Sequence, residues 1–208
     1  MIIPKLHYIS QGNTPEEHLE NIQKACTSGA ELVQLCLKNI SDKKLLKIAT
    51  EAREITGHFQ TRLLIYGNYK IAKEIKADGV HLDQPISNFK QIREHLYVWQ
   101  IIGGTANTLQ ECKSLIKKEA DYISLGPFSR KDENNLNLNN YTEIVKELDT
   151  KTPIIGFGDI ETKDVEDILE TGISGIAVSE AITRDFNSIS TFHKLLKSSS
   201  IDEQRYTM

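Results

Sequence analysis

Three charged side chains, Lys38, Asp159 and Glu180, each stand a few residues after a short apolar run and could carry a reaction. A lysine can hold a phosphate as a point charge, or work with a lowered pKa in a dry pocket. A carboxylate in a pocket can act as a general base. We therefore predict these three as catalytic residues, with a solvated lysine at a strand end as the alternative for Lys38.

A glycine-rich turn precedes one of these carboxylates. The segment Gly156-Phe157-Gly158 permits positive φ and close backbone approach, as phosphate cradles require. Asp159 and Glu180 oppose that function, because carboxylates beside a cradle repel an anion. An ordinary tight strand-to-helix turn is the alternative interpretation.

A cysteine and two histidines lie in apolar runs. Cys36 and Lys38 are two residues apart and share one face of a strand, so the lysine could lower the thiol pKa and make it reactive. The alternative is that Cys36 is a small buried hydrophobic residue. His81 and His7 are more typical of hydrogen-bonded core histidines than of catalysts. No pair spacing of His, Cys or Glu suggests a zinc site.

The composition indicates one folded domain. The chain has 208 residues, 39% of them hydrophobic and 26% charged, with a net charge of −4. An acidic chain without a basic block is a poor candidate for binding nucleic acid. It lacks a membrane-length apolar run, a secretory leader pattern and a Cys-x-x-Cys pair. Three widely spaced cysteines suit a reducing compartment, so we expect a cytoplasmic protein without a membrane partner.

Short apolar runs bounded by small or acidic turns predict eight strands. Between them lie segments of helical periodicity; Thr14 can cap one helix, with Pro15 at its first position and Glu17 completing a capping box. Ser41 and Thr162 open later helices. The runs that we assign to strands are 5–10, 32–35, 61–66, 79–82, 99–103, 123–125, 153–157 and 176–178.

Eight strand–helix units in 208 residues give about 26 residues per unit, which predicts a single-domain (β/α)8 TIM barrel, an α/β fold. An open doubly wound sheet is the alternative. It usually needs five or six strands, and no Gly-x-Gly-x-x-Gly follows the first run. We assign residues 1–196 to the barrel and 197–208 to a polar C-terminal tail that is frayed. The long segment 127–140 is either a working lid or a disordered connector.

Barrel enzymes place their reacting groups at the carboxyl ends of the strands. This rule adds a set of substrate-binding residues to the catalytic residues above, and it also points to Gln84. The set is Gln34, Cys36, Tyr66, Asn68, Asp83, Thr105, Asn107, Phe157, Gly158 and Ser179.

With these residues in place, the chain resembles thiamine-phosphate synthase from about Lys5 to Leu196. The resemblance implies a barrel that joins an aminopyrimidine diphosphate to a thiazole phosphate and releases diphosphate. Magnesium and basic residues would stabilise the departing negative charge. The matching stretches are 29–35 with Lys38, 76–82, 102–108, 120–127 and 172–179.

The chain departs from the family at its pocket. Cys36 stands where the family has an arginine, Tyr66-Gly67 replaces an Asn-Asp pair whose aspartate binds magnesium, and Ile86 replaces a second magnesium aspartate. The family has a threonine-rich, lysine-bearing loop that binds diphosphate, and residues 128–135 of this chain differ from it. The family's Gly-Gly phosphate turn is Gly158-Asp159 here. The retained positions are Gln34, Lys38, Thr105 and, more loosely, Asn107, Gly156 and Gly158.

These departures concentrate at strand ends while the barrel body keeps the family pattern, which indicates a pocket altered by natural divergence or by engineering. Three functions stay open: a synthase of weak or lost activity, an enzyme that uses a carboxylate base on a neutral aromatic substrate held against Tyr66 or Phe157, and a non-catalytic scaffold. The related thiazole tautomerases carry a working histidine near Asn107. We expect a small-molecule ligand and no magnesium or other cofactor, and the family resemblance implies a homodimer.

Overall fold

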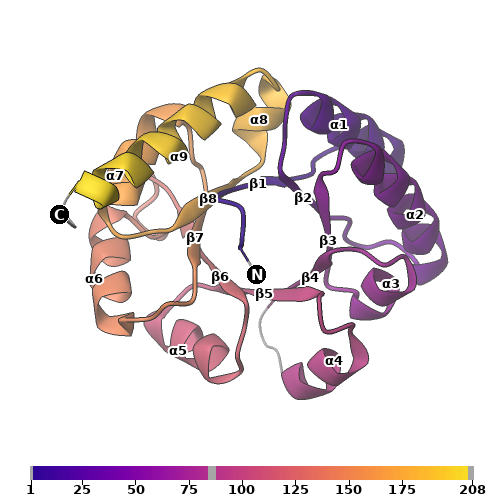
Figure 1. The fold of residues 1–208 in the computed structure, drawn as a ribbon, viewed down its shortest axis with the longest axis horizontal. Helices are drawn as coiled ribbons and strands as arrows, with labels where there is room; N and C mark the ends of the chain where they lie inside the picture. Colours follow the sequence, from indigo (N-terminus) through magenta and orange to yellow (C-terminus); the bar gives the residue numbers. More distant parts are fainter. Residues whose placement is uncertain (1, 84–87, 206–208) are drawn as a thin grey trace.

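A computed structural model describes residues 2–83 and 88–205, and Gln84 and Ile86 lie outside them. Eight parallel strands close into a barrel in chain order, with β1 pairing to β8 (Figure 1). The predicted (β/α)8 barrel is therefore confirmed, and the open-sheet alternative is wrong. The strands are β1 (Leu6–Ile9), β2 (Leu32–Leu35), β3 (Arg62–Tyr66), β4 (Gly79–Leu82), β5 (Ile101–Ala106), β6 (Tyr122–Phe128), β7 (Ile154–Gly158) and β8 (Gly175–Val178).

Helices form the outer ring of the barrel (Figure 1). Apolar side chains on their inner faces pack with the outward-facing residues of the strands into one core. They are α1 (Pro15–Thr27), α2 (Asp42–His58), α3 (Tyr69–Glu74), α4 (Phe89–His95), α5 (Leu109–Lys117), α6 (Leu138–Leu148), the 3-10 helix η1 (Thr162–Asp164), α7 (Val165–Glu170), α8 (Glu180–Arg184) and α9 (Ser188–Arg205).

The predicted helix starts are present at α1 and α2. The Thr14 hydroxyl accepts the Glu17 N–H at 3.2 Å, and the Ser41 hydroxyl accepts that of Lys44 at 3.4 Å. The expected capping box at α1 is only half formed. The Glu17 carboxylate accepts the N–H of Asn13 at 2.6 Å rather than that of Thr14. The helix still starts at Pro15 with Thr14 as its cap, as predicted.

The fifth strand begins later than its apolar run. Gln100 closes a turn before β5: its side-chain oxygen accepts the Tyr97 N–H at 3.0 Å, and its amide donates to the carbonyls of Ala72 and Ala77. Trp99 is thereby left 41% exposed. Hydrogen bonding by one buried glutamine, rather than hydropathy, sets this boundary.

Large rings fill the barrel interior where glycines make room. A Cβ on Gly103 would lie 2.0 Å from the ring of Tyr122. The Tyr122 hydroxyl is 2.7 Å from Nδ1 of His81, and His7 bonds to the Pro4 carbonyl through Nε2 at 3.0 Å. Both histidines are buried, so the prediction of hydrogen-bonded core histidines is confirmed.

Two segments differ from their predicted bounds. The long loop shortens to 129–137, because β6 continues to Phe128 and α6 starts at Leu138. Arg130 fixes this loop to η1 and α7 through ion pairs with Asp164, at 2.5 Å, and Asp167. The last helix, α9, runs through the expected boundary at 196/197 and continues to Arg205.

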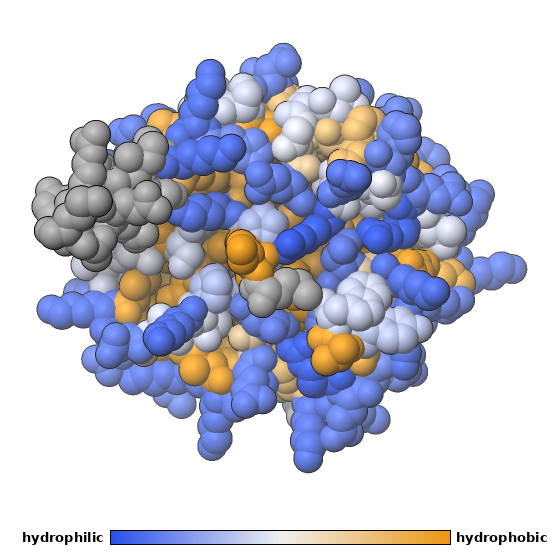
Figure 2. Space-filling view, viewed as in Figure 1, coloured by the Kyte–Doolittle hydropathy of each residue, from blue (hydrophilic) through white to orange (hydrophobic). Residues whose placement is uncertain are grey.

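Hydrophilic residues dominate the face shown in Figure 2, and the hydrophobic groups on it are small and scattered. Cys26, Cys36 and Cys112 are free thiols. Within the described ranges, no helix combines the length and hydrophobicity that a membrane crossing requires.

Candidate functional site

A cavity of about 300 Å³ opens between the carboxyl ends of the strands, and we call it the mouth cavity. Strand alternation explains its lining, since residues two apart share a face. Eight of the predicted site residues line it: Gln34, Cys36, Lys38, Tyr66, Asp83, Thr105, Asn107 and Phe157. The structure adds Ile9, His81, Ser124 and Pro127.

Tyr66 links the two charged groups of the mouth cavity. Its hydroxyl donates a hydrogen bond to Asp83, and the ammonium of Lys38 lies 5.0 Å from its ring centroid. Burial and then Asp83 raise the pKa of Tyr66, so the phenol keeps its proton at neutral pH. The tyrosine therefore places a cation on its ring face and an anion at its hydroxyl.

His81 forms part of the cavity floor. Its Nε2 lies 2.9 Å from the Thr105 hydroxyl, and its Nδ1 lies near that of Tyr122. Burial lowers the pKa of His81 from 6.5 to about 4, so the ring is neutral at physiological pH. We did not predict His81 as a site residue. Its position in β4, two residues before Asp83 and so on the same face of the chain, was the available signal.

The structure does not support a reactive thiol at Cys36. Burial raises the pKa of the thiol, and Lys38 offsets that effect only in part. The backbone N–H of Cys36 donates to the Ser10 hydroxyl at 3.1 Å. A protonated, partly buried cysteine matches the alternative of a small hydrophobic lining residue.

Asn68 is predicted to bind substrate, but it does not line the mouth cavity. Its side-chain oxygen accepts the Ile71 N–H at 3.0 Å and caps α3, while its amide donates to Asp42 at 3.1 Å. Helix capping by asparagine is common at this position and accounts for the residue.

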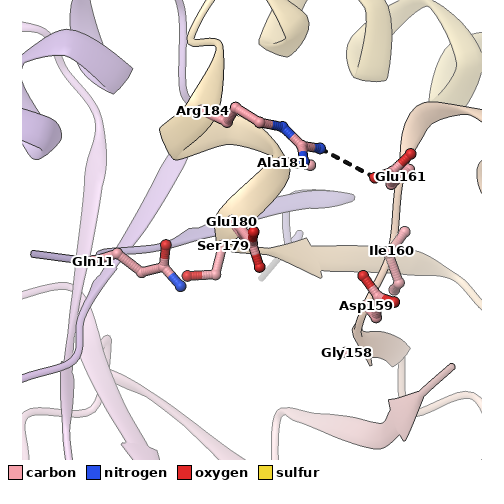
Figure 3. Close-up of a pocket in the computed structure, with 9 residues that line it drawn as sticks. All are labelled: Gln11, Gly158, Asp159, Ile160, Glu161, Ser179, Glu180, Ala181 and Arg184. Atoms are coloured by element: carbon pink, nitrogen blue, oxygen red, sulfur yellow. Dashed lines mark hydrogen bonds and ion pairs between the residues drawn. The ribbon is translucent and has the colours of Figure 1, made fainter. Parts of the chain in front are cut away.

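The remaining predicted residues line another cavity, of about 390 Å³, between the loops after β7 and β8. We call it the acidic cavity (Figure 3). In this view Asp159 projects from the loop after β7 and Glu180 from the start of α8. The lining comprises Gln11, Gly158, Asp159, Ile160, Glu161, Ser179, Glu180, Ala181 and Arg184. Asp83, Asp159 and Glu180 therefore do not share one cavity.

The acidic cavity occupies the place where barrels often bind phosphate. Arg184 is its one lining cation, and it pairs with Glu161 at 3.1 Å, which lowers the pKa of that carboxyl. Asp159 and Glu180 add negative charge that opposes an anion.

Packing against β6 explains why position 158 is a glycine, and its predicted role in binding substrate stays a prediction. Its φ is +139°, and a Cβ there would lie 2.3 Å from the backbone nitrogen of Phe128. The glycine therefore accommodates β6, which matches the interpretation of an ordinary turn.

The residues of the mouth cavity do not fit the magnesium of the resembled family. Magnesium is usually bound through carboxylates and oxygen ligands. Among the described residues that line the cavity, Asp83 is the one carboxylate, and it accepts a hydrogen bond from Tyr66. Across residues 2–83 and 88–205, no three His, Cys, Asp or Glu side chains group to hold a metal. Arg130, which a diphosphate could use, is bound to acids of η1 and α7 instead.

Fold and site together define a (β/α)8 barrel protein with a cavity of about 300 Å³ at the carboxyl ends of its strands. The family profile described as thiamine monophosphate synthase matches residues 6–182. The chain belongs to this family, which confirms the resemblance inferred from its motifs.

Relatives cover most of the chain. It is 37% identical over 201 residues to a thiamine-phosphate synthase of Flavobacterium psychrophilum, covering 93% of this chain and 98% of the relative. A thiamine-phosphate synthase of Methanococcus maripaludis is 30% identical over 203 residues, covering 93% and 95%. Thiamine phosphate pyrophosphorylase from Pyrococcus furiosus superposes with a TM-score of 0.80 at 24% identity, covering 93% of this chain and 96% of that one. This last likeness supports the fold alone.

Proposed function

We propose that this protein is a thiamine-phosphate synthase-like barrel whose coupling activity is weak or lost and whose mouth cavity binds an uncharged aromatic ring. The observation that carries the proposal is the charge of the mouth cavity. Its lining holds one lysine, which lies against Tyr66, and one carboxylate, which Tyr66 engages. Release of diphosphate requires cations where negative charge develops, and this lining supplies little positive charge.

The lining suits a planar neutral ligand. Tyr66 and Phe157 offer ring faces, while Gln34, Ser124 and Thr105 offer polar groups. Such a cavity can stack a ring and hydrogen-bond its edge. Lys38 and Asp83 balance each other in charge, so neither a strong cation nor a strong anion is favoured.

The carboxylate-base alternative has less support. Asp159 and Glu180 line the acidic cavity, whereas Tyr66 and Phe157 line the mouth cavity. A general base must come within hydrogen-bond reach of the proton that it removes. A ligand stacked on Tyr66 or Phe157 would therefore have to extend into the other cavity to meet either carboxylate.

Two measurements test the proposal. We expect little product from the aminopyrimidine diphosphate and the thiazole phosphate with magnesium; robust turnover would show that the charge argument is wrong. An aminopyrimidine without its diphosphate should raise the melting temperature through mass action.

We expect Tyr66→Ala to abolish that thermal shift, since the variant removes the ring face. Tyr97→Ala is the matched control, because Tyr97 stacks on Trp99 and does not line the mouth cavity. Equal shifts in both variants would contradict binding at the mouth. The expected homodimer stays a prediction, which analytical ultracentrifugation would test.

A further inference from the structure

Three polar side chains form a hydrogen-bonded network from the barrel interior to the mouth cavity. The Tyr122 hydroxyl lies 2.7 Å from Nδ1 of His81, and Nε2 of His81 lies 2.9 Å from the Thr105 hydroxyl. Tyr122 and His81 are buried, and Thr105 lines the mouth cavity. We call these three side chains the Tyr–His–Thr network.

A glycine on β5 makes the network possible. In the barrel β5 lies between β4, which carries His81, and β6, which carries Tyr122 (Figure 1). Gly103 is the Cα partner of both residues. A Cβ on Gly103 would lie 2.0 Å from the Tyr122 ring, so the missing side chain lets the phenol reach the imidazole across β5.

The proton of the Tyr122 hydroxyl fixes the direction of the first hydrogen bond. Among the described residues, His81 is the one hydrogen-bond partner of this hydroxyl. If Nδ1 of His81 carried a proton and donated it to Tyr122, the phenol proton would be buried without an acceptor. An unpaired buried donor costs about 1–3 kcal/mol. Tyr122 therefore donates to Nδ1.

The second hydrogen bond then has a fixed direction as well. Burial lowers the pKa of His81 to about 4, so the neutral ring carries one N–H. With Nδ1 accepting from Tyr122, that N–H is on Nε2, and it donates to the Thr105 oxygen. His81 is the one partner of the Thr105 hydroxyl among residues 2–83 and 88–205. The Thr105 proton is therefore available to a ligand in the mouth cavity.

We infer that Tyr122 is a positioning residue of the mouth cavity: acting through His81, it makes Thr105 a hydrogen-bond donor to the bound ligand. The inference rests on the proposed function and specifies the chemistry of the ligand. The edge of the ring at Thr105 carries a lone pair, such as that of an unprotonated ring nitrogen. A ring N–H at the same place would leave the Thr105 proton without an acceptor.

The first test is spectroscopic and needs no ligand. Long-range ¹H–¹⁵N correlation spectra of the full-length protein show which imidazole nitrogen of His81 carries the proton, and we expect Nε2 at pH 7. Tyr122→Phe removes the donor to Nδ1, so either tautomer leaves one nitrogen unpaired. We therefore expect the Nδ1 signal to shift about halfway toward that of a protonated nitrogen.

Tyr141→Phe is the matched control, because it removes a hydroxyl from another buried tyrosine. The Tyr141 hydroxyl donates to the Leu125 carbonyl at 2.8 Å and takes no part in the network. The His81 signals should stay unchanged in this variant. A proton on Nδ1 in the parent chain, or equal His81 spectra in the two variants, would overturn the inference.

The second test titrates 4-aminopyrimidine. Tyr122→Phe should weaken binding only about twofold, because roughly half of the molecules keep the competent tautomer. Thr105→Val, which removes the donor, should weaken binding about tenfold, and Thr105→Ser should restore it. Saturating ligand should also return the Nδ1 signal of Tyr122→Phe toward the parent value, since the ligand takes the Thr105 proton.

The outcomes separate this inference from the proposed function. An Nδ1 signal in Tyr122→Phe that does not respond to bound 4-aminopyrimidine, or equal affinities of Thr105→Val and the parent chain, would overturn the donor role of Thr105. Failure of the parent chain to bind 4-aminopyrimidine would contradict the proposed function. The His81 spectra would then still decide whether Tyr122 fixes the tautomer.

Discussion

Acidification should destabilise the protein through the two histidines in its barrel. Burial lowers the pKa of His81 from 6.5 to about 4 and that of His7 from 6.5 to about 3. Both rings are neutral in the folded state, whereas the unfolded chain takes up protons below pH 6.5. Their contribution to stability is therefore complete above pH 6.5 and falls as the pH drops toward 4 and then 3.

The size of this loss in stability follows from the difference between the folded and unfolded pKa values. Between pH 8 and pH 5, each histidine should remove about 2 kcal/mol from the free energy of unfolding, and the two together about 4 kcal/mol. Such a loss is a large fraction of the stability of an ordinary domain, about 5–15 kcal/mol. Urea unfolding at several pH values between 8 and 5 would measure it.

Replacing His81 tests whether the buried histidines cause this pH dependence of stability. His81→Gln removes one titrating ring, so the variant should lose about half of this histidine-linked pH dependence, whatever its stability at pH 8. His58→Gln is the control, because His58 is exposed at the end of α2. If His81→Gln and the parent chain show the same loss between pH 8 and pH 5, the reasoning about burial is refuted.

Two further perturbations concern the barrel. Gly103→Ala should lower the free energy of unfolding by about 3 kcal/mol, since the new Cβ would lie 2.0 Å from the Tyr122 ring. Gly57→Ala should be neutral or stabilising, because Gly57 lies in a helix and a Cβ there would meet no neighbouring atom. Thermal unfolding measures both. Arg130→Ala should cost about 1–3 kcal/mol, because it leaves the carboxylate of Asp164, which is 2% exposed, without its cation. Limited proteolysis should then cut the loop 129–137 faster.

Controls separate these effects from general damage. Lys131→Ala removes the adjacent cation and should leave stability and proteolysis unchanged, since its side chain is exposed. Unchanged cleavage in Arg130→Ala would show that the ion pairs do not hold the loop. Equal stabilities of Gly103→Ala and Gly57→Ala would contradict the packing argument for Tyr122.

Local sequence patterns predicted much of the fold. Thr14 and Ser41 cap helices as predicted, and the eight apolar runs became eight strands, because capping and burial depend on residues close in the chain. The start of β5 was misjudged because Gln100 bonds to backbone groups more than 20 residues away. The contacts of the loop at Arg130 likewise depend on acids 34 and 37 residues further on.

The sequence by itself determined the barrel, the family and the residues that stand at the strand ends, since strand periodicity places each side chain on a known face. Only the tertiary structure decided how those residues group. It separated Asp159 and Glu180 from Tyr66, assigned Asn68 to a helix cap, and brought His81 to the cavity floor. The physical reason is that strand position defines direction along one element, whereas a shared cavity depends on the closure of the whole barrel and on hydrogen bonds between distant segments.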